Sequence, residues 1–186
     1  MKQSKFPMIM KSVAAATSLL TVFFAVLFCR FSQGWLLSCA ISFGTTAYHF
    51  VMRLAVGYIL PKVTGYAFDY RKAWFQPRSW EPSFYKGIGI RHWKKGLPTY
   101  APEQFSMKHN SLHRIIQNMC GAEIVHEIIM VLSFLPLLTV PVFGTFPVFL
   151  ITSILAALYD SIFVMAQRYN RPRLVRIYEK QEAKGQ

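Results

Sequence analysis

Four long apolar runs constrain this chain more than any other feature. They extend over residues 13–29, 35–60, 122–143 and 146–166. As a helix rising about 1.5 Å per residue, the first run would span roughly 26 Å, close to the thickness of a hydrocarbon core. With 53% hydrophobic and only 16% charged residues, the chain is too apolar for an ordinary soluble domain. We therefore predict an all-α integral membrane protein with four transmembrane helices, forming one membrane-embedded domain over residues 1–186.

The positive charge lies almost entirely outside these runs. Three lysines precede the first run, ten Lys and Arg lie in residues 61–119, and six follow from residue 168 onward. The first short loop carries one and the third loop none. Because positively charged segments stay in the cytoplasm, we predict a multi-pass cell-membrane protein. Both termini, the segment 61–119 and the tail 167–186 would be cytoplasmic, and this topology explains the basic residues without a nucleic-acid partner.

The first apolar run begins as a secretory signal peptide does, with lysines before it. Phe28 and Arg30 flank Cys29, however, and this sequence is not a small-x-small cleavage site. We expect the run to be retained as a signal anchor. Cys29, Cys39 and Cys120 are odd in number and form no CxxC motif, so neither a disulfide framework nor a zinc site is predicted.

The segment 61–119, between the second and third spans, is rich in aromatic and basic residues. Trp74, Trp80 and Trp93 alternate with lysines and arginines. Such a composition is typical of a membrane interface, where aromatic rings sit at headgroup depth. We expect the segment to lie at the cytoplasmic face and to contact anionic lipids.

Several ionisable residues fall within the predicted spans, where a charge costs about 2.5–3.5 kcal/mol at a helix centre. A functional role is therefore the default hypothesis for each of them. Arg53 would find a partner in Glu123, Glu127 or Asp160, and such a pair would either join the helices or bind substrate. The alternative is that some of these residues lie at headgroup level. The six residues are His49, Arg53, Glu123, His126, Glu127 and Asp160.

Glu123 and His126 are spaced i, i+3 and project from one helix face. A carboxylate beside an imidazole can fix its tautomer and raise its basicity, so this pair could deprotonate a substrate hydroxyl. Glu-x-x-His is also half of a di-iron motif, but that architecture needs a second copy, and the sequence contains none. We predict catalytic roles for both residues and no metal.

Two short basic sequences are also distinctive. The first is Arg-His-Trp-Lys at residues 91–94, and the second is Gln-Arg-Tyr-Asn-Arg-Pro-Arg-Leu at residues 167–174. Arg168, Arg171 and Arg173 could bind phosphates through forked hydrogen bonds. Alternatively they are stop-transfer charges that contact anionic lipid. An Asn-Arg-Pro-Arg sequence is more than charge anchoring requires, which favours a binding role.

Taken together, these sequences resemble the glycosyl-4,4'-diaponeurosporenoate acyltransferase family, over about residues 68–174. The resemblance rests on residues 91–94, on Ala-Glu-x-x-His at residues 122–126, and above all on residues 167–174. It implies transfer of a fatty acyl group to a sugar hydroxyl of a membrane-dissolved glycolipid, the last step of staphyloxanthin-type carotenoid biosynthesis.

We combine this resemblance with the residues above in one mechanistic hypothesis. His126, oriented by Glu123, would deprotonate the acceptor hydroxyl as it attacks a thioester, without an acyl-enzyme. No bound cofactor is expected, and acyl-CoA or an acyl-carrier-protein thioester would be the co-substrate. The predicted substrate-binding residues are Arg53, Trp93, Lys94, Arg168, Asn170, Arg171 and Arg173.

Two other functions fit the sequence alone. One is a non-catalytic membrane partner or scaffold, in which the buried charges merely pair the helices. The other is a small membrane methyltransferase or reductase acting on a lipid, although no Gly-rich phosphate loop is present. The sequence leaves the acyl chain, the thioester carrier, the acceptor and the oligomeric state open.

Overall fold

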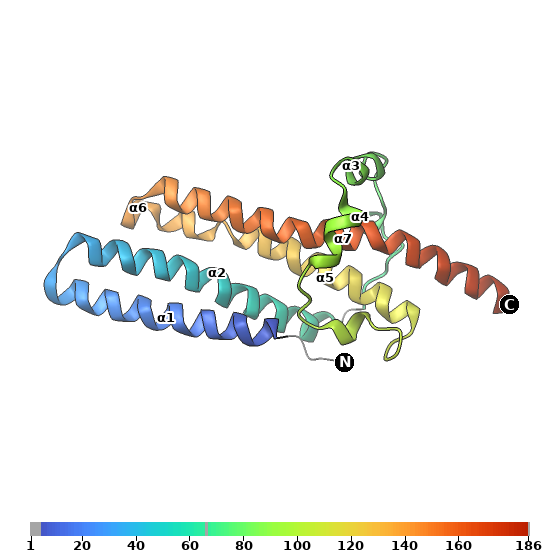
Figure 1. The fold of residues 1–186 in the computed structure, drawn as a ribbon, viewed down its shortest axis with the longest axis horizontal. Coiled ribbons are helices and arrows are strands. Elements are labelled where there is room, and N and C mark those ends of the chain that lie inside the picture. The colour runs from blue at the N-terminus through green and yellow to red at the C-terminus, as the bar shows by residue number, and fades with distance from the viewer. Residues whose placement is uncertain (1–4, 66, 186) are drawn as a thin grey trace.

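A computed structural model describes residues 5–65 and 67–185. This part of the chain is helical and contains no strand. Four long helices lie roughly parallel to one axis in two antiparallel pairs, and the short helices α3 (Glu81–Gly87) and α4 (Ile90–Trp93) lie on the opposite side from α6 (Val140–Phe143) along this axis (Figure 1). The long helices are α1 (Phe6–Phe31), α2 (Gly34–Thr64), α5 (Leu112–Leu132) and α7 (Phe146–Gly185).

The first pair, α1 and α2, is a tight hairpin. Ser32 ends α1 in the left-handed conformation, at φ 52°, and its N–H donates to the carbonyl of Phe28 at 2.8 Å. Along the hairpin the rings of Phe24 and Phe43 stack with centroids 5.5 Å apart. A Cβ at Gly44 would lie 3.3 Å from the methyl of Thr21, so glycine allows the two helices to approach closely.

The second pair begins where Ser111 caps α5, its hydroxyl accepting from the N–H of Arg114 at 3.2 Å. After α5 the chain continues through the 3-10 helix η4 (Leu135–Thr139) and the short α6 (Val140–Phe143). Pro136 and Pro141 are the second residues of these two short elements, in the first turn, where proline is tolerated. Gly144, at φ +68°, then reverses the chain into α7, which runs antiparallel to α5 (Figure 1).

The segment between α2 and α5 folds against the half of the second pair that includes the beginning of α5 and the C-terminal part of α7. A cluster of Tyr70, Phe75, Leu112, Ile116 and Cys120 is buried between this segment and α5, with Tyr178 of α7 packed against it. The segment contains five short elements: η1 (Ala73–Phe75), α3 (Glu81–Gly87), α4 (Ile90–Trp93), η2 (Lys94–Gly96) and η3 (Pro102–Phe105).

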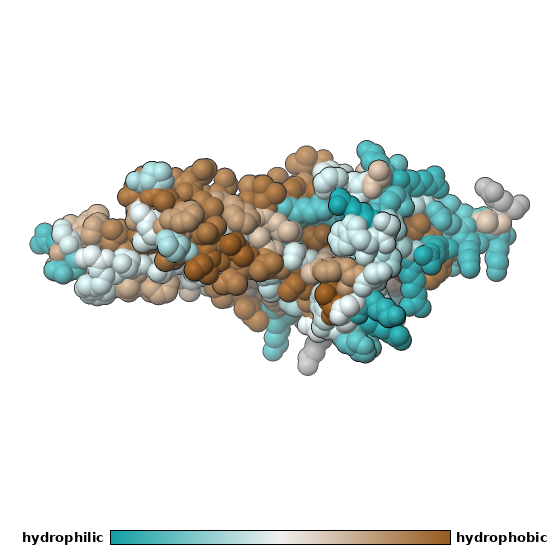
Figure 2. Space-filling model, turned by 90° about the horizontal axis from the view of Figure 1, so that it is seen from above, coloured by the Kyte–Doolittle hydropathy of each residue, from teal (hydrophilic) through white to brown (hydrophobic). Residues whose placement is uncertain are grey.

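In the described residues, three helical stretches are long and apolar enough to cross a membrane: Phe6–Phe31, Leu112–Phe143 and Phe146–Lys184. Figure 2 shows hydrophobic side chains over the middle of the molecule and hydrophilic ones around the small helices and the C-terminal end. The all-α class and the membrane character predicted from sequence are thus confirmed. A second span at residues 35–60, which falls on α2, stays a prediction.

The boundaries of the predicted segments shift. The helix of the second apolar run extends beyond the predicted span 35–60. It continues to Thr64, with Pro61 inside the helix. Likewise, the helix of the third run begins at Leu112, ten residues before its apolar stretch. The extension of α5 carries polar residues among buried Leu112, Ile115, Ile116 and Met119, so tertiary packing stabilises a stretch that hydropathy alone does not mark as a span.

Candidate active site

Three charged or titratable side chains from three helices meet inside the molecule. Nδ1 of His126, on α5, lies 2.9 Å from Oδ1 of Asp160, on α7. The other carboxylate oxygen of Asp160 accepts from Nε of Arg53, on α2, at 3.1 Å and from its Nη2 at 2.5 Å. Asp160 is 1% exposed, so this chain of contacts is shielded from solvent on the carboxylate side.

The surrounding backbone and rings hold these groups in place. Arg53 also donates to the carbonyls of His49 and Ala156, at 3.0 and 3.2 Å. The imidazole of His126 stacks on Phe163, with centroids 4.6 Å apart and planes within 9°. Because Asp160 and Phe163 are one helical turn apart on α7, a single face of that helix contacts the imidazole both at its edge and on its plane.

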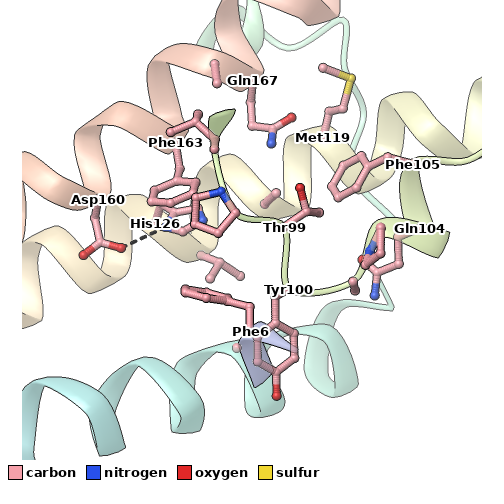
Figure 3. Close-up of a pocket in the computed structure, with 18 of the residues that line it drawn as sticks. Phe6, Thr99, Tyr100, Gln104, Phe105, Met119, His126, Asp160, Phe163 and Gln167 are labelled. Carbon is pink, nitrogen blue, oxygen red and sulfur yellow. Dashed lines mark hydrogen bonds and ion pairs between the residues drawn. The ribbon is translucent and has the colours of Figure 1, made fainter. Parts of the chain in front are cut away.

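The His126–Asp160–Arg53 chain forms part of the wall of a cavity of about 890 Å³. This volume is typical of small-molecule sites. Apolar side chains from α2, α5 and α7 line much of the cavity, and the stretch 97–105 covers one side of it (Figure 3). A long apolar chain therefore has room beside a polar, titratable group.

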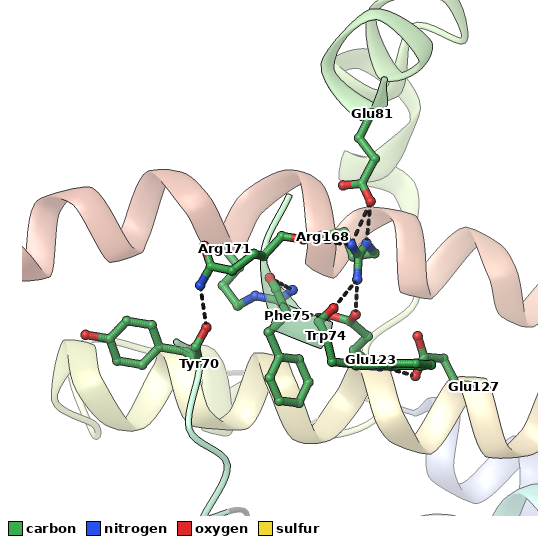
Figure 4. A network of polar contacts seen from close by, with 9 residues as sticks. Tyr70, Trp74, Phe75, Glu81, Glu123, Glu127, Arg168 and Arg171 are labelled. Atoms are coloured by element: carbon green, nitrogen blue, oxygen red, sulfur yellow. Dashed lines mark hydrogen bonds and ion pairs between the residues drawn. The ribbon is translucent and has the colours of Figure 1, made fainter. Parts of the chain in front are cut away.

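Glu123 has a different environment from His126. Its side chain is fully buried, and its two oxygens pair with two arginines of α7, Oε1 with Nη1 of Arg168 at 2.6 Å and Oε2 with Nη1 of Arg171. Arg168 also pairs with Glu81 of α3, at 2.6 Å. Figure 4 shows these side chains converging between α5, α7 and the segment before α3.

This network is charge-balanced and connects the segment between α2 and α5 to the α5–α7 pair. Arg168 donates to the carbonyls of Trp74 and Gln76, and Arg171 donates to the carbonyl of Phe75. Two guanidinium groups are thus matched by two carboxylates and by backbone carbonyls. The hydrogen-bonding capacity of both arginines is directed inward, as a buried ion network requires.

The structure therefore gives several predicted site residues other partners. Nδ1 of His126 contacts Asp160, whereas the two oxygens of Glu123, its predicted partner, pair with arginines. Arg168 and Arg171, predicted to bind a donor phosphate, both pair with the buried carboxylate of Glu123, and their binding role stays a prediction. The catalytic role of His126 stays a prediction, with Asp160 rather than Glu123 in contact with the imidazole.

The remaining predicted residues divide between the cavity and the surface. Arg53, Lys94, Asn170 and Arg173 line the same cavity as His126. Lys94 donates from Nζ to Oδ1 of Asn170 and lies 4.5 Å from the ring centroid of Tyr169. Trp93 does not line this cavity, and its indole N–H donates to the carbonyl of Ile88 at 3.0 Å.

Two residues have roles here that the sequence does not predict. The sequence marks Asp160 as a charge within a span and as one possible partner of Arg53, but not as the partner of His126. Glu81 lies in a segment with an interfacial composition, yet it is 2% exposed. The signal for Asp160 is its cost inside a membrane. No sequence signal distinguishes Glu81 from a solvated acid.

The described residues form no recognisable metal centre. Within residues 5–65 and 67–185, no group of three or more His, Cys, Asp or Glu side chains is arranged to hold a metal ion.

A comparison with protein-family models matches glycosyl-4,4'-diaponeurosporenoate acyltransferase over residues 71–180, more than half of the chain. The chain belongs to this acyltransferase family. Family membership confirms the resemblance seen in the sequence and makes the protein an acyltransferase of the carotenoid pathway. No curated protein and no solved structure matches the chain.

The matched region of this acyltransferase contains both features described above. Residues 71–180 include His126, Asp160 and the whole Glu81–Glu123–Arg168–Arg171 network, whereas Arg53 lies before the match on α2. The family region thus carries the histidine and its carboxylate partner, and the first helix pair adds the arginine that holds this carboxylate.

Proposed function

We propose that this acyltransferase moves a fatty acyl group from a cytosolic thioester to a sugar hydroxyl of a glycosylated carotenoid or a similar membrane glycolipid. The observation that carries the proposal is the cavity of about 890 Å³ that places His126 and Asp160 beside an apolar lining. An acceptor dissolved in the membrane and an acyl chain both need such a lining, and the transfer needs a base within it.

The chemistry follows from the contacts of the imidazole. A carboxylate only accepts hydrogen bonds, so Asp160 fixes the proton of His126 on Nδ1 and leaves the lone pair of Nε2 for a substrate. Nε2 would take the proton of the sugar hydroxyl as its oxygen attacks the thioester carbonyl. The new C–O bond forms, the C–S bond breaks, and the proton then passes from Nε2 to the departing thiolate.

Arg53 would act through Asp160 in this scheme. Its two hydrogen bonds to Oδ2 fix the orientation of the carboxylate toward the imidazole. The ionised carboxylate would then stabilise the imidazolium that forms when His126 accepts a proton.

Replacement of Asp160 by Asn should lower kcat by about 10²–10⁴-fold, because the amide keeps the volume but no longer fixes the tautomer or stabilises the imidazolium. The measurement is acyl transfer by purified enzyme in lipid nanodiscs. Asp69→Asn is the control, since Asp69 is exposed and does not line the cavity. Equal kcat values for Asp160→Asn and the wild type would remove Asp160 from the mechanism.

The reaction itself is tested by mass spectrometry of total lipids from cells with and without the gene. An acylated glycolipid should disappear in the deletion, and its mass would give the acceptor and the acyl chain together. Identical lipid profiles, under conditions in which the protein is made, would contradict the proposed transfer.

A four-span topology with both termini and the segment 61–119 in the cytoplasm completes the proposal. It is supported by the concentration of Lys and Arg in that segment and in the tail. It also puts Lys94, Asn170 and Arg173, which line the cavity and are predicted to bind substrate, on the side where acyl thioesters are made.

Cysteine labelling tests this topology. In a variant without Cys29, Cys39 and Cys120, Gln33→Cys and Lys108→Cys place thiols at exposed positions of the first loop and of the segment before α5. A membrane-impermeant maleimide should label Gln33→Cys in intact cells and Lys108→Cys only after permeabilisation. Labelling of both in intact cells would contradict the arrangement.

A further inference from the structure

A second cavity, of about 960 Å³, lies at the cytoplasmic end of α7, between this helix and the segment containing α3 and α4. Its lining differs sharply from that of the first cavity, because basic side chains dominate it. Beyond Arg168, whose charge is already balanced by carboxylates, six cations line this cavity: Lys86, Arg91, Lys94, Lys95, Arg173 and Arg176.

These six charges are not neutralised by the protein. The acidic residue in the lining, Glu81, is paired with Arg168. In the part of the chain that the structure describes, none of the six cations forms an ion pair with a carboxylate. Burial, together with the nearby charges of Arg173, Lys95 and Arg91, lowers the pKa of Lys94. The cavity therefore concentrates positive potential that an anionic ligand would relieve.

The two cavities share a wall. Lys94, Asn170 and Arg173 line both of them, and Lys94 donates to Asn170 across this boundary. On one side of the wall lie the cations, and on the other lie His126 and the apolar lining. A ligand with an anionic head and a long, thin, mostly neutral arm would fit this arrangement, with the head in the second cavity and the arm directed toward the imidazole.

We propose that the second cavity binds the phosphorylated adenosine head of coenzyme A, so that the pantetheine arm passes the Lys94–Asn170–Arg173 wall and presents the thioester to His126. The inference rests on the proposed function and specifies its donor. Several phosphate groups on one nucleotide match a cluster of six cations. An acyl carrier protein brings a single phosphate on its arm and would bind through its own surface. Arginine forks at Arg91, Arg173 and Arg176 suit such phosphates.

Donor discrimination tests the proposal. The purified enzyme in phosphatidylcholine nanodiscs is given the same acyl group on coenzyme A or on pantetheine, which lacks the nucleotide. The wild type should use acyl-CoA with the higher kcat/KM. Arg91→Gln and Arg176→Gln should each lower the ratio of kcat/KM for acyl-CoA to kcat/KM for acyl-pantetheine by about tenfold. Each variant removes charge-assisted hydrogen bonds to phosphate. Arg78→Gln, an exposed arginine outside both cavities, should keep the full discrimination.

Direct binding separates failure of this inference from failure of the proposed function. Adenosine 3',5'-bisphosphate, measured by equilibrium dialysis, should bind the wild type and Arg78→Gln and should bind Arg91→Gln and Arg176→Gln about tenfold more weakly. Nucleotide binding without acyl transfer would support the cavity assignment and contradict the transfer. The inference would be overturned if the wild type used both thioesters equally well or preferred a carrier-protein donor. It would also be overturned if the Arg91 and Arg176 variants lost only their binding to anionic lipid.

Discussion

Replacement of His126 by Ala is expected to reduce acyl transfer by about 10²–10⁴-fold, the usual contribution of a positioned base. Among the described residues, the imidazole of His126 and the guanidinium of Arg53 both contact Asp160 and line the first cavity, and of these two only the imidazole serves readily as a base. Without it, nothing there would take the proton of the acceptor hydroxyl. The measurement is product formation by the purified protein, with mass spectrometry of the acylated lipid.

The His126→Ala protein should still insert and assemble, since the change removes one stacking contact and one ion-pair partner near the cavity. The expected loss of stability is about 0.5–1.5 kcal/mol for the ring stack. His109→Ala is the matched control, because His109 is exposed and lines neither cavity. An active His126→Ala enzyme would remove the proposed base and with it the mechanism.

Replacement of Glu123 by Ala is expected to destabilise the protein by about 3–5 kcal/mol, the cost of leaving a buried charge unpaired. Arg171 is only 2% exposed, and both it and Arg168 would lose a carboxylate partner. Both arginines also donate to the carbonyls of Trp74 and Phe75, so the attachment of this segment to α7 would weaken. The measurement is size-exclusion chromatography of the detergent-solubilised protein after heating, which gives the fraction that stays monodisperse.

The same variant decides between two roles for Glu123. The sequence alone predicts a catalytic carboxylate, whereas the contacts describe a buried centre of a structural network. A Glu123→Ala protein as stable as the wild type but inactive would restore the catalytic role. Glu179→Ala, at an exposed position of α7, should change stability by no more than about 0.5 kcal/mol and controls for the loss of a carboxylate.

Some properties of this protein are determined by the sequence itself. Apolar runs long enough to span a bilayer predict helices. The concentration of Lys and Arg in the termini and in residues 61–119 predicts that these segments lie on one side of the membrane. Short motifs at residues 91–94, 122–126 and 167–174 indicate the acyltransferase family on their own, and the family match over residues 71–180 agrees. Each of these signals depends only on residues close together in the chain, so it can be recognised in a single sequence without the tertiary structure.

The partners of the buried charges are decided only by the tertiary structure. Glu123 and His126 are neighbours on α5, yet one contacts Arg168 and Arg171 and the other contacts Asp160. Because α5 and α7 are antiparallel, positions further along α5 meet positions earlier on α7 (Figure 1). A separation of three residues on one helix thus corresponds to about two turns on the other. Register and rotation of packed helices set these pairings, and neither is written in the spacing of residues within one helix.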